Sequence, residues 1–222
     1  MTVPFASIED VVFHIANVLR IPVLVAALLA LAMVLIELGA LAVELKRRGR
    51  RDRAAVKRAA RAARTALAAG DRAGAGRELV AAASSQAMHG VFAALLEQLA
   101  GPEPLDSNAL SKDIADFDLG SLQRLERTRL LVRAGPALGL MGTLIPLSPA
   151  LSGLASGNIK QLTDNLRVAF SVTVLGLLIG VIAFGISLVR DRMYAQDLSD
   201  VEFIAAELEA AVHSAPVQGG SA

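Results

Sequence analysis

Three long stretches of the chain carry almost no charge. Ile21 to Val43 is apolar except for Glu37, and the segments from Ala134 to Ile159 and from Val168 to Val189 have no charged residue. About 20 apolar residues suffice to cross a bilayer as a helix, so each stretch predicts a transmembrane helix. A chain of 222 residues is too short to enclose three such helices in a soluble core. A signal peptide is not expected either, because no basic residue precedes Arg20 and a basic run follows the first stretch.

The rest of the chain has a helical pattern of apolar positions and no strand signal. We therefore predict an all-α integral membrane protein with three transmembrane helices, its N-terminus outside and long helical extensions in the cytoplasm. The predicted segments are an outer amphipathic helix at 1–20, spans at 21–43, 134–156 and 168–190, a cytoplasmic helical region at 44–133, a short outer connector at 157–167, a cytoplasmic helix at 191–213 and a disordered tail at 214–222.

The first segment has two interpretations. Its apolar residues fall on one helical face, which is typical of a helix that lies on a membrane surface. A simple extension of the first span fits equally well. The residues of this face are Ile8, Val11, Val12, Ile15, Val18 and Leu19.

The region between the first two spans predicts several helices. A helix rich in alanine and arginine is expected at 53–69, and the helical pattern resumes at 77–99. Residues 101–104 predict a turn, and the next helix is expected from about Ser111. The residues predicted to break the helix between 69 and 77 are Gly70, Gly74 and Gly76.

Basic residues predict the orientation. The segment from Lys46 to Arg64 has ten basic residues and one acid. Because lysine and arginine are enriched in cytoplasmic loops, this segment is predicted to lie inside and the N-terminus outside. A nucleic-acid partner is not expected, since a basic cluster beside a span is explained by topology and by anionic lipid headgroups. The residues assigned to the lipid headgroup region are Lys46, Arg47, Arg48, Arg50 and Arg51.

Composition narrows the possible chemistry. The chain has no cysteine, only three widely separated histidines and 4% aromatic residues. This composition argues against a thiol nucleophile, a metal centre and the aromatic platforms that stack on nucleic-acid bases. No nucleophile–base pair or phosphate-binding loop is visible either. We therefore expect no enzyme activity, no cofactor and no metal.

Small residues form a stripe along each of the last two spans. Positions spaced alternately four and three residues apart lie on one face of a helix. On the second span these positions hold only glycine and proline, and on the third span they hold only small residues. Small residues let helix backbones approach closely in lipid. The stripes therefore predict tight helix packing, an oligomer, or the lining of a narrow passage. They consist of Gly135, Gly139, Gly142, Pro146, Pro149 and Gly153, and of Ala169, Thr173, Gly176, Gly180, Ala183 and Ser187.

Two prolines in the second span remove helical hydrogen bonds. Pro146 has no N–H to donate to the carbonyl of Gly142, and Pro149 has none for that of Ile145. Within a membrane, such carbonyls must be met by other protein groups or by water in a cavity.

Hydroxyl side chains are candidates for lining a polar path. The rise per residue places Thr143 roughly 14 Å, and Thr173 roughly 26 Å, from the cytoplasmic ends of their spans. These heights predict that the two threonines mark two successive levels of one path. Further hydroxyls for this path could come from Ser148, Ser152 and Ser171. For each threonine the alternative is a bond back to its own helix backbone.

Two sequence motifs then resemble a known family. GPALGLMGT at 135–143 and AFSVTVLGLLIG at 169–180 resemble the paired signature of the MotA/TolQ/ExbB proton-channel family. That signature is an alanine-proline-leucine-glycine-leucine-glycine-threonine stretch in one span and a small-x-x-threonine-x-x-glycine-leucine stretch in the next. VLIEL at 34–38 resembles the isoleucine-glutamate sequence that ends the family's first span. The close resemblance covers roughly residues 125–195, and the rest of the chain agrees in layout.

The resemblance implies a function. It implies a ring of subunits, typically a pentamer, around a single-span partner of the ExbD/TolR/MotB type in the plasma (inner) membrane of a prokaryote. Protons pass between ring and partner, and their flow drives movement. It also implies that Thr143 and Thr173 line the pore, that Pro136 stands at its cytoplasmic entry, and that Glu37 is the first-span glutamate.

The chain departs from the family pattern in two places. Val168 stands five residues before Thr173, where ExbB-like members have a glutamate, and two prolines follow Thr143. The last two spans thus contain no titratable group, so we expect the partner to supply the proton-carrying aspartate. Glu37, the only ionisable residue in a core span, is either the inner exit of the path or a salt-bridge partner of Lys46 or Arg47. A sodium-driven member and a non-conducting scaffold are the alternatives.

Overall fold

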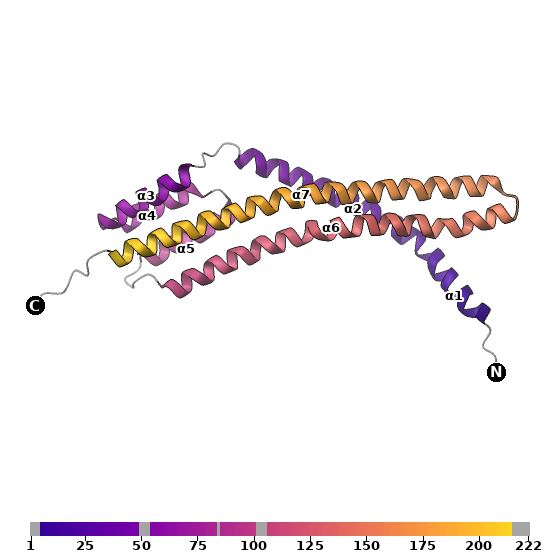
Figure 1. The fold of residues 1–222 in the computed structure, drawn as a ribbon, viewed down its shortest axis with the longest axis horizontal. Coiled ribbons are helices and arrows are strands. Elements are labelled where there is room, and N and C mark those ends of the chain that lie inside the picture. The colour runs from indigo at the N-terminus through magenta and orange to yellow at the C-terminus, as the bar shows by residue number, and fades with distance from the viewer. Residues whose placement is uncertain (1–4, 49–53, 84, 101–105, 215–222) are drawn as a thin grey trace, which may run out of the picture. The chain divides into compact units, whose positions relative to one another are not determined.

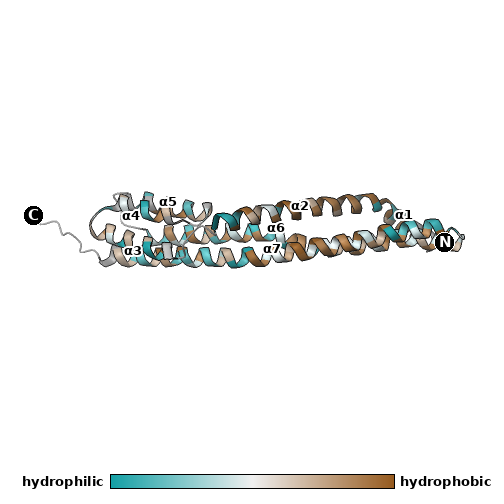
Figure 2. Ribbon diagram, turned by 90° about the horizontal axis from the view of Figure 1, so that it is seen from above, coloured by the Kyte–Doolittle hydropathy of each residue, from teal (hydrophilic) through white to brown (hydrophobic). Residues whose placement is uncertain are grey.

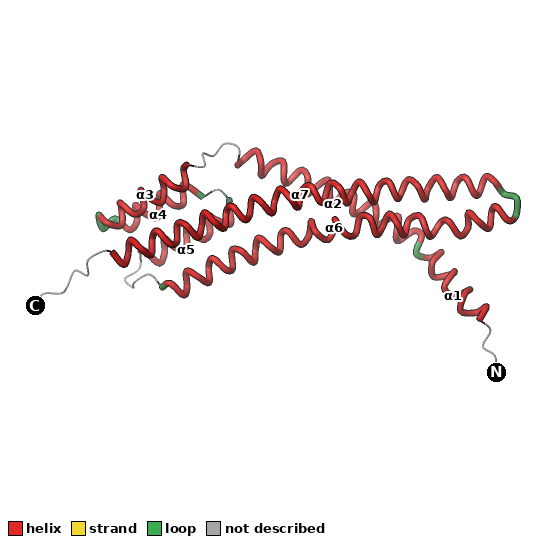
Figure 3. Tube along the Cα trace, in the orientation of Figure 1, coloured by secondary structure: helices red, strands yellow, loops and turns green. Residues whose placement is uncertain are grey.

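The computed structural model describes residues 5–48, 54–83, 85–100 and 106–214, which are helical apart from short connections (Figures 1 and 3). No strand occurs in these ranges. The helices are α1 (Phe5–Val18), α2 (Arg20–Arg48), α3 (Ala54–Ala68), α4 (Arg72–Ala82), α5 (Gln86–Ala100), α6 (Ser107–Ala155) and α7 (Ile159–Ser214).

Three helical stretches are long and apolar enough to cross a membrane. They are Val11–Arg48, Ser107–Ala155 and Ile159–Ala211. Figure 2 shows their hydrophobic parts as brown stretches of α2, α6 and α7. The predicted all-α protein with three membrane spans is confirmed.

The chain divides into two compact units. The first, called the membrane unit here, consists of Met1–Ala42 and Leu125–Val189. The second, called the helical bundle, consists of Val43–Arg124 and Arg190–Ala222. Each unit is described separately below.

In the membrane unit, α6 and α7 form an antiparallel hairpin with a very short turn. Only Ser156 to Asn158 are non-helical between the two helices. Gly157 has φ +73°, a backbone conformation that glycine adopts without strain. The Asn158 side chain then accepts a hydrogen bond from the backbone N–H of Gln161 at 3.1 Å and so begins α7. The predicted connector at 157–167 is therefore helical from Ile159 onward.

The N-terminal helix α1 is distinct from α2, but the two are joined by helix-like bonds. The backbone N–H of Leu19 donates to Ile15 at 3.1 Å, and that of Val23 donates to Leu19 at 3.0 Å. The break is thus limited to Leu19. The apolar residues predicted to share a face of α1 are all exposed in the single chain: Ile8, Val11, Val12, Ile15, Val18 and Leu19.

The helical bundle has a core of large side chains. It is built from α3, α4 and α5 together with the parts of α6 and α7 that belong to this unit. Alanines of α3 allow close packing against α4, while α4 and α5 contribute bulky groups. The large side chains with almost no exposed surface include Leu79, Met88, Phe92, Leu95, Leu110 and Leu208.

The breaks between the bundle helices differ from those expected. Gly70 has φ +79° and lies between α3 and α4, as expected of a breaker. Gly74 and Gly76, however, lie inside α4. The reason is that the Asp71 carboxylate caps α4 by accepting from the Gly74 N–H at 2.8 Å, which stabilises a helix start in a glycine-rich sequence.

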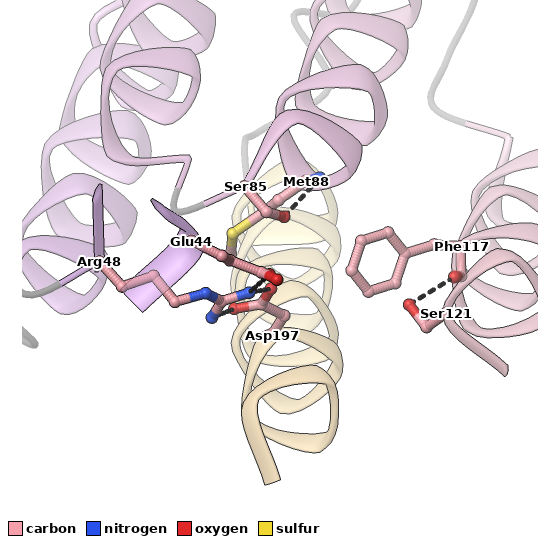
Figure 4. Close-up of polar contacts among 7 residues, drawn as sticks. All are labelled: Glu44, Arg48, Ser85, Met88, Phe117, Ser121 and Asp197. Carbon is pink, nitrogen blue, oxygen red and sulfur yellow. Dashed lines mark hydrogen bonds and ion pairs between the residues drawn. The ribbon is translucent and has the colours of Figure 1, made fainter. Parts of the chain in front are cut away.

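The stretch predicted as one helix at 77–99 is two helices, α4 and α5. Ser85 begins the second of them, since its hydroxyl oxygen accepts a hydrogen bond from the Met88 N–H at 3.2 Å (Figure 4). Helix α6 begins at Ser107, slightly earlier than predicted. The predicted turn at 101–104 and residues 215–222 of the predicted tail lie outside the described residues.

Candidate functional site

The small stripes of α6 and α7 face each other inside one hairpin. A Cβ atom placed on Gly135 would lie 2.7 Å from the carbonyl oxygen of Gly176. A Cβ atom on Gly176 would lie 2.7 Å from the Cα atom of Gly139. Both separations are too short for real atoms, so the two helices touch through their backbones. Only glycine at these positions permits this contact.

The contact continues along the hairpin in both directions. A Cβ atom on Gly180 would lie 2.9 Å from Cδ of Pro136, and one on Gly142 would overlap the Val172 side chain. Gly153 approaches Gln161 near the turn. The remaining stripe members are buried or half-buried: Pro146, Pro149, Ala169, Ala183 and Ser187. Much of both stripes is thus used for packing within a single chain.

The register of the hairpin places the two threonines about one helical turn apart in height. The Thr173 hydroxyl lies 3.4 Å from the Gly139 carbonyl oxygen on α6 and 3.1 Å from the Ala169 carbonyl oxygen on its own helix. Thr143 follows Gly139 by four residues, roughly 6 Å along α6. Thr143 and Thr173 are therefore within about one helical turn of each other in height.

The predicted separation of the two threonines, roughly 12 Å in height, is therefore wrong. That prediction assumed that the predicted cytoplasmic ends of the two spans, at 134 and 190, lie opposite each other. In the hairpin, a Cβ atom on Gly135 would lie 2.8 Å from the backbone nitrogen of Gly180, so the start of the second span faces a residue well inside the third.

Helix α2 packs against one side of the hairpin. Val23 of α2 shares a small cavity with Ile145 and Pro146 of α6 and with Val168 of α7. On α6, Thr143 lies about 160° round the helix from Ile145 but only about 60° from Pro146, so it borders the side that α2 covers. Thr173 is five residues from Val168, about 140° round α7. We call the side that carries Thr143 and Thr173 the threonine face.

The hydroxyls mainly bond to their own helices. Thr143 donates to the Leu140 carbonyl at 2.7 Å, which is the predicted alternative to a free pore-lining hydroxyl. Ser171 donates to the Arg167 carbonyl at 2.8 Å. Ser148 and Ser171 are both exposed. They lie about 140° and 160° round their helices from Thr143 and Thr173, so one chain does not bring the serines to the threonine face.

Glu37 lies on the packing face of α2. It is half-buried and stands three residues after Val34 and four before Leu41, which are both buried. A carboxylate in an apolar helix is a functional candidate by default. Its two predicted roles, inner exit and salt bridge to Lys46 or Arg47, remain predictions.

In the bundle, Arg48 makes an ion pair that the sequence analysis did not predict. Its Nη1 atom donates to the Asp197 carboxylate at 2.8 Å, its Nη2 atom donates to the other oxygen of that carboxylate, and Nη2 also lies 3.4 Å from Glu44 (Figure 4). Asp197 is almost fully buried. Arg48 is therefore bound within the protein rather than held for lipid headgroups. Lys46 and Arg47 are exposed, while Arg50 and Arg51 lie outside the described residues.

Burial around this ion pair also shifts the pKa values of neighbouring groups. Burial raises the pKa of Asp200, and the nearby Asp197 carboxylate raises it further, while Arg48 and Lys57 lower it in part. Burial likewise raises the pKa of Tyr194. Across the described ranges, no group of three or more histidine or carboxylate side chains is placed to hold a metal ion.

The hairpin of the membrane unit lies within the part of the chain that matches a known family. A model of the MotA/TolQ/ExbB proton channel family matches residues 84–202, more than half of the chain. The protein belongs to the MotA/TolQ/ExbB proton channel family. No match was found among curated proteins or among solved structures. The matched range includes Thr143 and Thr173, whereas α2 with Glu37 lies outside it.

Proposed function

We propose that this protein is the ring-forming subunit of a proton-conducting membrane motor that is driven by the proton-motive force. It would lie in the inner membrane of a prokaryote, assemble as a pentamer and work with a single-span partner of the ExbD/TolR/MotB type. Membership of a proton channel family supports the channel part of this proposal.

The position of Thr143 and Thr173 carries the proposal. Both are half-buried on the hairpin and lie within about one helical turn of each other in height. Their exposed neighbours are apolar: Leu140, Leu147 and Leu177. A single apolar helix of a partner, placed along the threonine face, buries these leucines and brings one carboxylate beside two hydroxyls.

The proton carrier is then supplied by the partner. The charge-free segments of α6 and α7 contain no acid, base or histidine. A hydroxyl can donate and accept hydrogen bonds, so Thr143 and Thr173 can orient water or the carboxylate of a partner aspartate. Neither can carry a proton across the membrane alone. Glu37 is proposed as the inner exit of the path, and Lys46 and Arg47 as anchors in the lipid headgroups.

Proton flux in liposomes tests this proposal. The chain is reconstituted with its candidate single-span partner, and a pH-sensitive dye reports flux after a membrane potential is imposed. We expect flux with the intact partner and none when the partner's intramembrane aspartate is replaced by asparagine. Thr143→Val and Thr173→Val are expected to lower the flux about fivefold, because removal of a hydroxyl from a proton path costs on the order of one hydrogen bond, about 1 kcal/mol.

Ser171→Ala is the matched control for Thr173→Val. It also removes a hydroxyl that bonds to its own helix, but from another face of α7. Flux should persist in this variant. If a verified complex shows no flux and both threonine variants behave like the parent, the chain is a non-conducting scaffold. Flux of sodium without a proton signal assigns it to a sodium-driven branch.

A further inference from the structure

A small cavity lies between α2 and the hairpin. Its lining is mainly apolar, and Arg20 at the start of α2 is its one charged residue. The other lining residues are Val23, Leu24, Gly142, Ile145, Pro146 and Val168. About 10 Å³ is free for the centre of a water molecule, which is close to the room that one water needs.

Two residues that line this cavity, Gly142 and Ile145, have backbone carbonyls that have lost their helical partners. Pro146 and Pro149 stand four residues after Gly142 and Ile145 within the continuous helix α6. Neither proline has an N–H to donate. In an apolar environment, an unmet carbonyl costs several kcal/mol, so both acceptors need a donor from elsewhere.

Arg20 is placed to supply donors to these carbonyls. Its guanidinium has five N–H groups and always carries a positive charge. The side chain is half-buried and lines the same cavity as Gly142 and Ile145. A guanidinium and two carbonyls that lack a helical donor are complementary, and the cavity has room for about one water molecule.

We propose that this cavity holds one ordered water molecule that links Arg20 to the backbone of α6. The water accepts a hydrogen bond from the Arg20 guanidinium and donates one each to the carbonyl oxygens of Gly142 and Ile145. Three polar partners are typical of a buried water. The site explains how α6 stays helical through Pro146 and Pro149.

A double-mutant cycle tests the water site and needs no proton flux. Arg20→Leu is made in the full chain and in the variant P146A/P149A, where alanine restores the two missing N–H donors. In the natural background, Arg20→Leu is expected to lower the thermal midpoint by roughly 3–6 °C. In P146A/P149A it should lower it by less than about 1 °C, because the carbonyls then bond within the helix.

Arg167→Leu serves as the control, since Arg167 is exposed and does not line the cavity. Its effect should be equal in the two backgrounds. An equal effect of Arg20→Leu in both backgrounds, or no effect in either, overturns the site. If Arg20→Leu fails to fold in the natural background and folds in P146A/P149A, the site is supported. Arg20→Lys keeps the charge, so its thermal midpoint should lie between those of the parent and Arg20→Leu.

A further measurement tests the water directly. A structure of the assembled protein that resolves waters should show one peak between Arg20 and the two carbonyls, and direct guanidinium–carbonyl contact without a peak overturns the water.

Discussion

The membrane unit and the helical bundle bring helices together by opposite means. In the hairpin of the membrane unit, α6 and α7 meet at Gly135, Gly139 and Gly176, where any added methyl group overlaps backbone atoms. In the bundle, the helices meet through bulky groups such as Phe92 and Leu79, which have no exposed surface. The glycine Gly120 of the bundle part of α6 has open space where a Cβ atom would lie.

This difference follows from the solvent of each unit. In water, burying a large apolar side chain removes it from an unfavourable environment, so bulky residues drive assembly. In lipid, apolar side chains gain nothing by leaving the solvent, and helices associate through close contact between atoms. The same substitution should therefore have different effects in the two units.

Truncation of a core side chain in the bundle should have the largest effect. Phe92→Ala is expected to destabilise the bundle by about 3–5 kcal/mol, because it removes a fully buried ring and leaves a cavity. Phe184→Ala, which removes an exposed ring from the membrane unit, is the matched control and should leave the fold of one chain nearly unchanged. Thermal unfolding followed by circular dichroism measures both. Equal losses would show that side-chain burial drives both units.

Addition of one methyl group to the hairpin contact should have the next largest effect. Gly176→Ala places a Cβ atom 2.5 Å from the Gly135 carbonyl oxygen, and backbone cannot move aside cheaply. We expect a loss of about 1–3 kcal/mol. Gly185→Ala lies on the same helix with nothing within 4 Å and should be neutral or slightly stabilising. Unfolding in detergent compares the two variants, and a tolerant Gly176 would exclude the backbone contact.

The same change in the bundle should be favourable. Gly120→Ala adds a methyl group to a helix interior where nothing lies within 4 Å. Alanine restricts the unfolded chain more than glycine does, so the free energy of unfolding should rise by about 0.5–1 kcal/mol. A loss of stability in chemical denaturation would show that this surface is occupied in the assembled protein.

The smallest expected effect depends on pH. Because burial raises the pKa of Asp200 in the folded state, its protonation favours folding. This contribution is complete below the unfolded value of about 3.9 and is lost as pH rises through the folded pKa. Asp200→Asn should therefore raise the thermal midpoint at pH 7, and the advantage should shrink toward pH 4. A constant difference between variant and parent across that range would refute the shift.

The fold could be predicted from sequence to a large extent because a bilayer permits few backbone structures. A charge-free run long enough to cross a bilayer must be a helix, and a stripe of glycine must be a contact. Gly135, Gly139 and Gly176 were found in this way. The same reasoning identified the carbonyls of Gly142 and Ile145 as unmet.

What the sequence could not show is which residues stand opposite one another. The pairing of Gly135 with Gly180, and hence the height of Thr143 relative to Thr173, depends on how one helix is shifted along the other. The Arg48–Asp197 ion pair joins residues that are 149 positions apart. The sequence placed Arg48 in a basic run, but only the fold brings a buried carboxylate to it.

The glycine contact of the hairpin also bears on how the protein is made. Closing an ordinary helix pair freezes side-chain rotamers and loses conformational entropy. Gly135, Gly139 and Gly176 have no rotamers to lose, and in a membrane their backbones are already helical before the helices meet. The hairpin can therefore close as soon as both of its helices have been inserted during biosynthesis. The bundle must first order the side chains of Phe92, Leu79 and their neighbours, so the membrane hairpin is expected to form before the core of the bundle.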